Sequence, residues 1–157
     1  MKRLLFTCIL LVAAWALFAQ TGLFGLYYGE SYKAVRDSLE SYDPAFEILE
    51  EEGAKCVFVS YGNEYVDQLV CYFDKAKGVL VSWQVFYIDQ EDEDIWDVAY
   101  NAASDWHDEG DWDDDSEVYY WEFGGGKELR IGYNSDYWLV ADYYNEAYSE
   151  YAEVVFW

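Results

Sequence analysis

The densest group of potential metal ligands in this sequence is an acidic run, "DEGDWDDDSEVYYWE", at residues 108–122. Alternating carboxylates suit a calcium loop, because a turning backbone brings their oxygens around one hard cation. Ser116 stands where such a loop needs glycine, and the residues after Val118 favour a strand over a helix. A calcium site is therefore one hypothesis, and an exposed acidic loop is the other. The acids with the required spacing are Asp111, Asp113, Asp115, Glu117 and Glu122.

The sequence shows no recognisable set of catalytic residues. His107 is the only histidine, next to Trp106 at the end of a predicted helix, and we interpret it as a surface residue. No serine has a nucleophile-elbow context, and the glycines at 124–126 join two predicted strands instead of preceding a helix. Acids beside aromatic rings also suit glycan binding, but the sequence indicates no catalytic pair. We expect a protein without catalytic activity and without a cofactor, unless the acidic run binds calcium.

The first half of the chain predicts one helix and four strands. Residues 30–42 carry apolar side chains at helical spacing, and Pro44 ends the pattern. Strand patterns follow at 45–51, 55–61, 65–74 and 79–88, separated by glycine-containing turns.

The second half predicts the same succession. A helix is expected at 95–106, after an acidic run that suits a helix N-terminus. Strands are expected at 118–123, 128–133, 137–144 and 151–157, and the connection at 107–117 is predicted to be a loop.

An internal match supports a duplication. Residues 46–65 align with residues 118–137 without a gap, which indicates a repeated unit of about 70 residues. We therefore predict an α+β fold of two tandem units, 20–88 and 89–157. Each unit is one helix plus a four-stranded antiparallel sheet, and the two pack into one body. In the aligned strands, we expect Val57, Val59, Leu129 and Ile131 on the core side, and Cys56, Phe58, Glu128 and Arg130 on the other.

The segment "YGESYKAVRDSL" resembles the helix opening of the beta-lactamase-inhibitor-protein group and the related small outer-membrane assembly lipoproteins. Val35 and Leu39 follow the glycine and serine in the expected places, although the second predicted helix lacks the motif. The resemblance covers both halves in topology, and it implies a protein-binding scaffold without catalysis.

The first 19 residues have the features of a secretory signal peptide. Lys2 and Arg3 precede an apolar run that ends at Phe18, and Ala19 is a small residue at the expected cleavage point. No second long apolar segment follows, so we predict a periplasmic or secreted protein with no stable membrane span after cleavage. An alternative is a small outer-membrane barrel, because the chain ends in an aromatic residue.

The acidic balance restricts the partners. The formal net charge is −23 at pH 7, and removal of Lys2 and Arg3 makes the chain more negative. Such a charge repels nucleic acid and anionic lipid and favours cations or basic partners. The aromatic content of 22% is too high for a disordered acidic chain.

Two cysteines follow the predicted signal peptide. Cys56 and Cys71 flank the turn pattern "SYGNEY", so a hairpin there would place them opposite each other. An exported protein can keep a disulfide, but cross-strand bridges need tight geometry. The sequence is compatible with a disulfide between them and with two free thiols.

The favoured function is recognition of a protein partner, with a basic surface, through an aromatic-rich sheet face. Tyrosine and tryptophan dominate binding hot spots, and the exposed anchors that we predict are Trp83, Trp121, Trp138 and Tyr144. The alternatives are a calcium-binding module and a glycan-binding protein.

Overall fold

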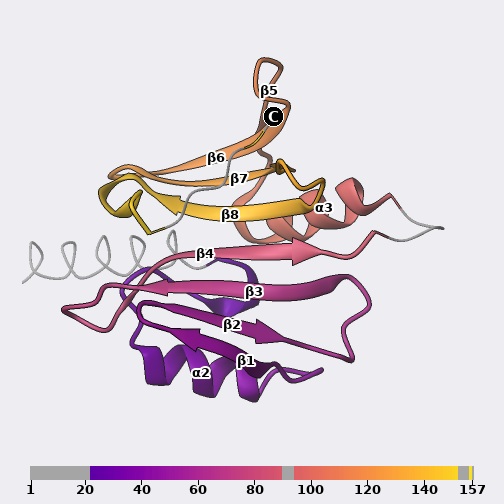
Figure 1. Cartoon of the computed structure of the whole chain (residues 1–157). Helices are drawn as coiled ribbons and strands as arrows, with labels where there is room; N and C mark the ends of the chain where they lie inside the picture. Colours follow the sequence, from indigo (N-terminus) through magenta and orange to yellow (C-terminus); the bar gives the residue numbers. More distant parts are fainter. Residues whose placement is uncertain (1–21, 90–93, 152–155, 157) are drawn as a thin grey trace, which may run out of the picture.

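One continuous antiparallel sheet of eight strands forms the centre of the structure (Figure 1). The computed structural model describes residues 22–89, 94–151 and 156, and the predicted signal peptide lies outside these ranges. The strand order is β1-β2-β3-β4-β8-β7-β6-β5. Each half of the sheet therefore runs in chain order from an outer edge to the centre, where β4 meets β8.

The described elements are short and closely spaced. The helical elements are η1 (Leu23–Gly25), α2 (Tyr32–Glu40), α3 (Ile95–His107) and η2 (Glu146–Tyr148). The strands are β1 (Glu47–Glu52), β2 (Lys55–Val59), β3 (Val66–Phe73), β4 (Leu80–Tyr87), β5 (Asp111–Asp113), β6 (Val118–Gly124), β7 (Lys127–Tyr133) and β8 (Leu139–Asn145).

The predicted fold class, two helix-plus-four-stranded units with separate sheets, is wrong. All eight described strands join one antiparallel sheet, and the described residues contain only two α-helices. The reason is the pairing of β4 with β8, which connects the two halves by backbone hydrogen bonds. The predicted boundary between the two units, at residues 88/89, falls between β4 and α3. The sheet contains strands from both sides of this boundary.

Both α-helices begin at a side-chain cap and bury one stripe. The Ser31 hydroxyl accepts a hydrogen bond from the Ala34 N–H at the start of α2, and the Asp94 carboxylate accepts one from the Trp96 N–H at the start of α3. The buried positions recur at four-residue steps, as an amphipathic helix requires. They are Val35 and Leu39 in α2, and Ile95, Ala99 and Ala103 in α3.

The β4–β8 pair carries a stacked aromatic contact in the core. Trp83 lies directly opposite Tyr143, and the two rings stack with centroids 4.2 Å apart and an interplanar angle of 11°. Both side chains are fully buried. Because a cross-strand aromatic pair stabilises a sheet beyond its buried area, this contact strengthens the connection between the two halves.

The two helices cover the same face of the sheet. The strand registers place six residues in one row across it: Cys56, Cys71, Trp83, Tyr143, Leu129 and Trp121. All six belong to the core cluster that also contains the buried stripes of α2 and α3. Residues of one row share a face because side chains alternate along each strand.

We predicted that aligned residues of the two hairpins point to the same side of the sheet, and this prediction is wrong. Leu129 lies on the helix-covered face in the row of Cys56, so its aligned partner Val57 lies on the opposite face. The same holds for Ile131, which shares a row with Phe58 instead of Val59. A shift of one residue in a strand exchanges its two faces.

The second half also differs from the predicted elements in its strands. The connection at 107–117, expected to be a loop, contains β5, which pairs with β6. The strand predicted at 151–157 falls largely outside the described residues. Of that segment, Phe156 forms an isolated bridge with Asn134.

The N-terminal described segment is held on the sheet by Tyr143. The Leu23 N–H donates to the Tyr143 hydroxyl at 2.8 Å, and the His107 Nε2 lies 3.0 Å from the same oxygen. Burial lowers the pKa of His107 to about 4, so its ring is neutral at pH 7 and can accept the hydroxyl proton. The expectation that His107 is a plain surface residue is wrong, because it is half-buried and belongs to this hydrogen-bonded group.

We expect Tyr143→Phe to lower the free energy of unfolding by about 1–2 kcal/mol, because it leaves the buried Leu23 N–H without its acceptor. Urea unfolding followed by tryptophan fluorescence measures the change. Tyr61→Phe, at a ring that is 84% exposed, is the matched control. Equal unfolding midpoints for Tyr143→Phe and the unsubstituted protein would show that this hydrogen bond is unimportant.

Candidate functional site

Two of the four predicted aromatic anchors are core residues. Trp83 is fully buried in its stack with Tyr143, and Trp121 is 6% exposed. The Trp121 indole N–H donates to the Asp108 carbonyl at 3.1 Å. The prediction of these two side chains as exposed anchors is therefore wrong, because they fill the space between the sheet and the helices.

The other two predicted anchors are accessible but do not lie together. Trp138 is 40% exposed and packs its edge on Phe86 with ring centroids 6.4 Å apart. Tyr144 is half-buried on the face opposite Tyr143, and the Arg130 guanidinium lies 4.6 Å from its ring centroid. The four residues therefore form no common surface.

The predicted calcium ligands lie in and beside the β5–β6 hairpin. The Asp113 carboxylate accepts hydrogen bonds from the Ser116 hydroxyl and the Asp115 N–H, and these bonds lower its pKa. Asp113 therefore shapes the turn. Within the described ranges, no three His, Cys, Asp or Glu side chains are grouped to hold a metal ion. Strand pairing places Asp111 opposite Tyr120, and Glu122 lies beyond the end of β5.

The two described cysteines are adjacent free thiols. Cys56 and Cys71 are directly opposite in the β2–β3 pair, and both are buried. Burial raises the pKa of Cys56 to about 11, so the thiol is neutral at pH 7. The sequence left open whether these cysteines form a disulfide, and in the structure they are two free thiols.

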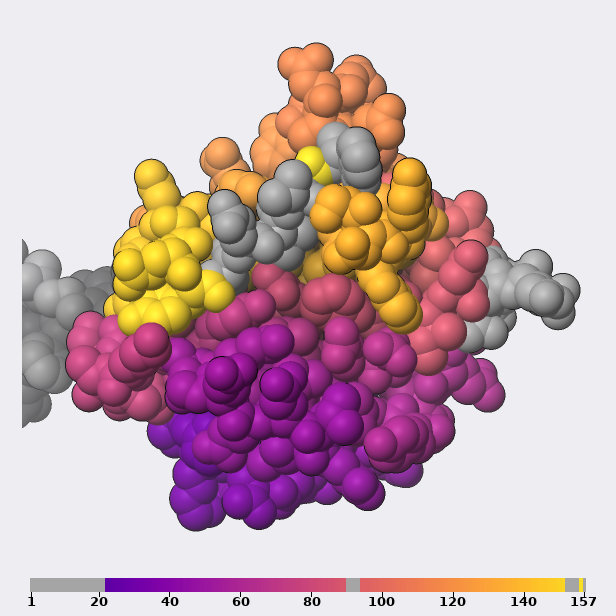
Figure 2. Space-filling view, viewed as in Figure 1, coloured from indigo at the N-terminus to yellow at the C-terminus, as the bar shows by residue number. Residues whose placement is uncertain are grey.

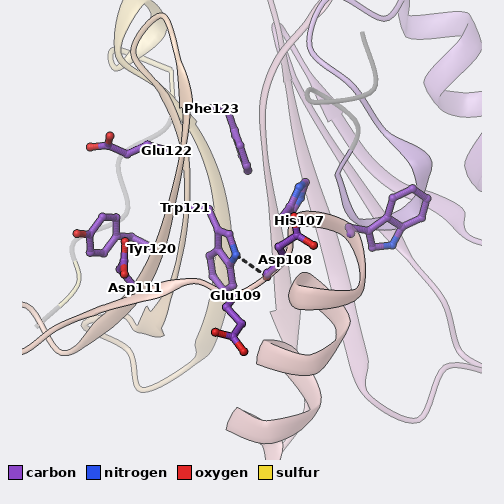
Figure 3. Close-up of a pocket in the computed structure, with 9 residues that line it drawn as sticks. His107, Asp108, Glu109, Asp111, Tyr120, Trp121, Glu122 and Phe123 are labelled. Atoms are coloured by element: carbon purple, nitrogen blue, oxygen red, sulfur yellow. Dashed lines mark hydrogen bonds between the residues drawn. The ribbon is translucent and has the colours of Figure 1, made fainter. Parts of the chain in front are cut away.

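A cleft lies at the C-terminal end of α3, against β6. It encloses about 490 Å³, and we call it the acidic cleft. Trp121, Phe123 and His107 face one another between β6 and α3, whereas Tyr120 and Glu122 point to the other side of β6 (Figure 3). The complete lining is Trp106, His107, Asp108, Glu109, Asp111, Tyr120, Trp121, Glu122 and Phe123.

The backbone between α3 and β5 is shaped to form this cleft. Asp108, which ends α3, has φ 63° and ψ −160°, a conformation that is almost restricted to glycine. Two residues later, Gly110 lies against Trp121, where an added Cβ would be 2.5 Å from the indole ring. The connection therefore follows the surface of a buried tryptophan at van der Waals distance.

The cleft lies beside an open strand edge. The three residues of β5 pair only with Val118, Tyr119 and Tyr120 of β6. From Trp121 to Gly124, β6 pairs with β7 on one side, and no strand within the described ranges pairs with the other. The β5–β6 hairpin projects from the body of the molecule at the top of the space-filling view (Figure 2). The backbone groups on this edge can therefore accept an added strand.

Negative charge dominates the cleft. Its lining contains the four carboxylates of Asp108, Glu109, Asp111 and Glu122, and neither lysine nor arginine. All four are exposed. Carboxylates in a concave surface attract cations, and the net charge of −23 reinforces that field.

A buried carboxylate lies on the sheet face opposite the helices. Asp142 is 1% exposed, between Gln84 of β4 and Arg130 of β7. Neither carboxylate oxygen makes a hydrogen bond of good geometry to the described residues. Burial raises the pKa to about 7, although Gln84 and Arg130 each lower it in part. The sequence did not identify Asp142 as a buried carboxylate. Its apolar neighbours in "WLVADYY" predict a buried strand, but they do not show which residues face the acid.

Sequence reasoning also missed the acidic cleft as a unit. Asp111 and Glu122 were predicted as calcium ligands, and they do line one site, but as part of a surface that includes His107 and Trp121. The one available signal was the mixture of acids and aromatics at 106–123.

In the part of the chain that the structure describes, no helix has the length and apolar character needed to span a membrane.

Comparison with known proteins finds no matching family model, no matching curated protein and no matching solved structure. The resemblance suggested by "YGESYKAVRDSL" stays a prediction.

We expect Gly110→Ala to lower the free energy of unfolding by about 2 kcal/mol, because the new methyl group would overlap the Trp121 ring. Asp108→Gly, two residues away, should leave stability unchanged or raise it, because glycine adopts the Asp108 conformation without strain. Chemical unfolding of both variants measures the difference. Equal effects of the two substitutions would contradict the packing described here.

We expect Asp142→Asn to become progressively more stable than the unsubstituted protein as the pH rises from 5 to 8. In the unfolded chain Asp142 ionises near its ordinary pKa of 3.8, but in the folded protein it keeps its proton up to about 7. The contribution of the protonated form is thus complete at low pH and lost as the pH rises through 7. The full cost of burying the charge is up to roughly 4 kcal/mol.

Thermal unfolding across this pH range tests the effect of Asp142→Asn. Asp67→Asn, at an exposed position of β3, removes the same charge and is the control. A stability difference from the unsubstituted protein that is the same at pH 5 and pH 8 would show that Asp142 has an ordinary pKa.

Proposed function

We propose that this chain is an exported binding protein without catalytic activity, which recognises a basic, extended segment of a protein partner in the acidic cleft. The observation that supports this most is the position of the cleft, which has four carboxylates beside an unpaired length of β6. Export rests on the sequence pattern of the first 19 residues.

The charge of the cleft supports a basic ligand. Lysine or arginine side chains of a partner would meet Asp108, Glu109 and Asp111 without a competing cation in the lining. The fourth carboxylate, that of Glu122, also borders a neighbouring pocket that contains Lys127 and Arg130. Rim carboxylates of this kind accelerate association and select the sign of the partner. Binding should therefore weaken with added salt.

The strand edge supports an extended segment. A peptide added to the outer edge of β6 would pair with the backbone from Trp121 to Gly124, where β5 has already ended. Strand addition obtains affinity from main-chain hydrogen bonds and specificity from the side chains that alternate along the peptide. Such side chains would lie beside the carboxylates and beside Trp106, which is 53% exposed.

The opposite edge of the sheet is similar in charge but lies outside the acidic cleft. β1 is also acidic, with the sequence "EILEEE", and its register shifts between Ile48 and Glu50, as that of β6 does between Glu122 and Gly124. The β1 edge therefore provides a matched control surface with similar charge.

We expect an acetylated and amidated peptide of alternating lysine and threonine to bind and to change the tryptophan fluorescence. The double variant Glu109→Gln, Glu122→Gln should weaken binding about tenfold, because it removes two of the four cleft charges. The matched control, Glu50→Gln with Glu52→Gln in β1, removes the same charge and should retain the affinity.

A second peptide separates strand addition from simple charge attraction. Methylation of all the backbone amides between the end groups keeps every lysine but removes the main-chain donors of both edges, so binding should be lost. If the methylated peptide binds equally well, or if both double variants weaken binding equally, the proposal of an edge-specific site is wrong.

A further inference from the structure

A second cleft, between the first turns of α3 and the β5–β6 hairpin, is lined by aromatic rings. It encloses about 540 Å³, and we call it the aromatic cleft. Its lining shares no residue with the acidic cleft. The lining residues are Asp94, Trp96, Asp97, Tyr100, Asn101, Trp112 and Tyr119.

The rings reach this cleft from two elements. Trp96 and Tyr100 lie four residues apart in α3, which places them on one helix face. Trp112 and Tyr119 are directly opposite each other in the β5–β6 pair. Tyr119 connects the two sets, because its ring centroid lies 4.5 Å from that of Tyr100 and 4.8 Å from that of Trp112.

Three of the rings are steeply inclined to one another. Trp96 and Trp112 are 5.9 Å apart at 67°, Trp96 and Tyr119 are 6.0 Å apart at 70°, and Trp112 and Tyr119 meet at 62°. The Trp112 indole N–H donates to the Asp114 carboxylate at 2.7 Å, which fixes the ring on an exposed edge strand. Trp112 is 44% exposed, so this wall of the cleft is accessible from solvent.

The electrostatics of this cleft favour a cation. The face of an aromatic ring carries negative electrostatic potential, which attracts ammonium groups within about 6 Å. Asp94 and Asp97 add carboxylates at the rim, and the lining contains no lysine or arginine. The net charge of −23 adds to this local field.

The same walls distinguish between kinds of cation. Calcium and magnesium need six or more oxygen ligands, and aromatic carbons supply none. One of the two carboxylates, that of Asp94, already caps α3 through the Trp96 N–H. An organic cation keeps its charge near the carboxylates and buries alkyl groups against the rings, which suits both parts of the lining.

We infer that the aromatic cleft binds a small organic cation of the alkylammonium class. This inference goes beyond the proposed function, because it concerns another cleft and another chemical class of ligand. The juxtaposition of Trp96, Trp112 and Tyr119 with Asp97 supports it.

Choline and tetramethylammonium are the probes, and the Kd is measured by calorimetry at constant ionic strength. The control ligand is 3,3-dimethylbutan-1-ol, which has the shape of choline without its charge. We expect choline to bind about tenfold or more tightly than this alcohol, because the ring faces and carboxylates stabilise the charge. Equal binding of the two ligands, or no binding of choline, would overturn the inference.

Two protein variants locate the site. Trp112→Leu removes a ring from the exposed edge strand and should weaken choline binding about tenfold, whereas Trp138→Leu, at a tryptophan of similar exposure outside both clefts, should leave it unchanged. Circular dichroism checks that both variants are folded. Equal Kd values for Trp112→Leu and the unsubstituted protein would place the site elsewhere and overturn the inference.

Asp97→Asn provides a second test that leaves all rings in place, and it should weaken choline but not the neutral alcohol. A chitin oligosaccharide that binds while choline does not would assign the cleft to glycans instead. The variants Glu109→Gln and Glu122→Gln of the acidic cleft should not affect choline binding, so failure of one proposal is distinguishable from failure of the other.

Discussion

The structure depends on the pairing of β4 with β8. This pair joins two halves of the chain that each run from an edge strand to the centre, and it stacks Trp83 on Tyr143 inside the core. Tyr143 then holds Leu23 and contacts His107, so the N-terminal segment and the end of α3 are both tied to the centre of the sheet. The position of α3, and with it the acidic cleft, follows from this junction.

A single open sheet has two outer edges, and both are acidic here. β1 carries exposed glutamates, and the short β5 carries Asp111 and Asp113. Carboxylates on edge strands oppose uncontrolled association between copies of a sheet. At β6, however, the covering strand ends early, so an edge with carboxylates around it is left open beside Trp121. The same charge that protects the edge from other acidic chains would select a basic segment, which is the basis of the proposed function.

The local elements could be predicted from the sequence, whereas their assembly could not. Helical spacing identified α2 and α3, and alternation with glycine turns identified most strands. The β4–β8 contact joins residues far apart in sequence, and no periodic pattern encodes such a pairing. The alignment of 46–65 with 118–137 led to a wrong prediction of side-chain direction. Val57 and Leu129 are aligned and both buried, yet they lie on opposite faces of the sheet. Aromatic residues were hard to assign for a similar reason, since Trp121 fills the core and Trp112 reaches solvent from neighbouring strands.

Amide hydrogen exchange, with and without a saturating basic peptide, tests the central claim most directly. In the free protein, the amides of β4 and β8 that pair at the junction should exchange slowest, because the rest of the sheet depends on them. On binding, the amides on the outer edge of β6 between Trp121 and Gly124 should become protected, while those on the outer edge of β1 should not. Fast exchange at the junction, or protection at β1 in place of β6, would contradict the account.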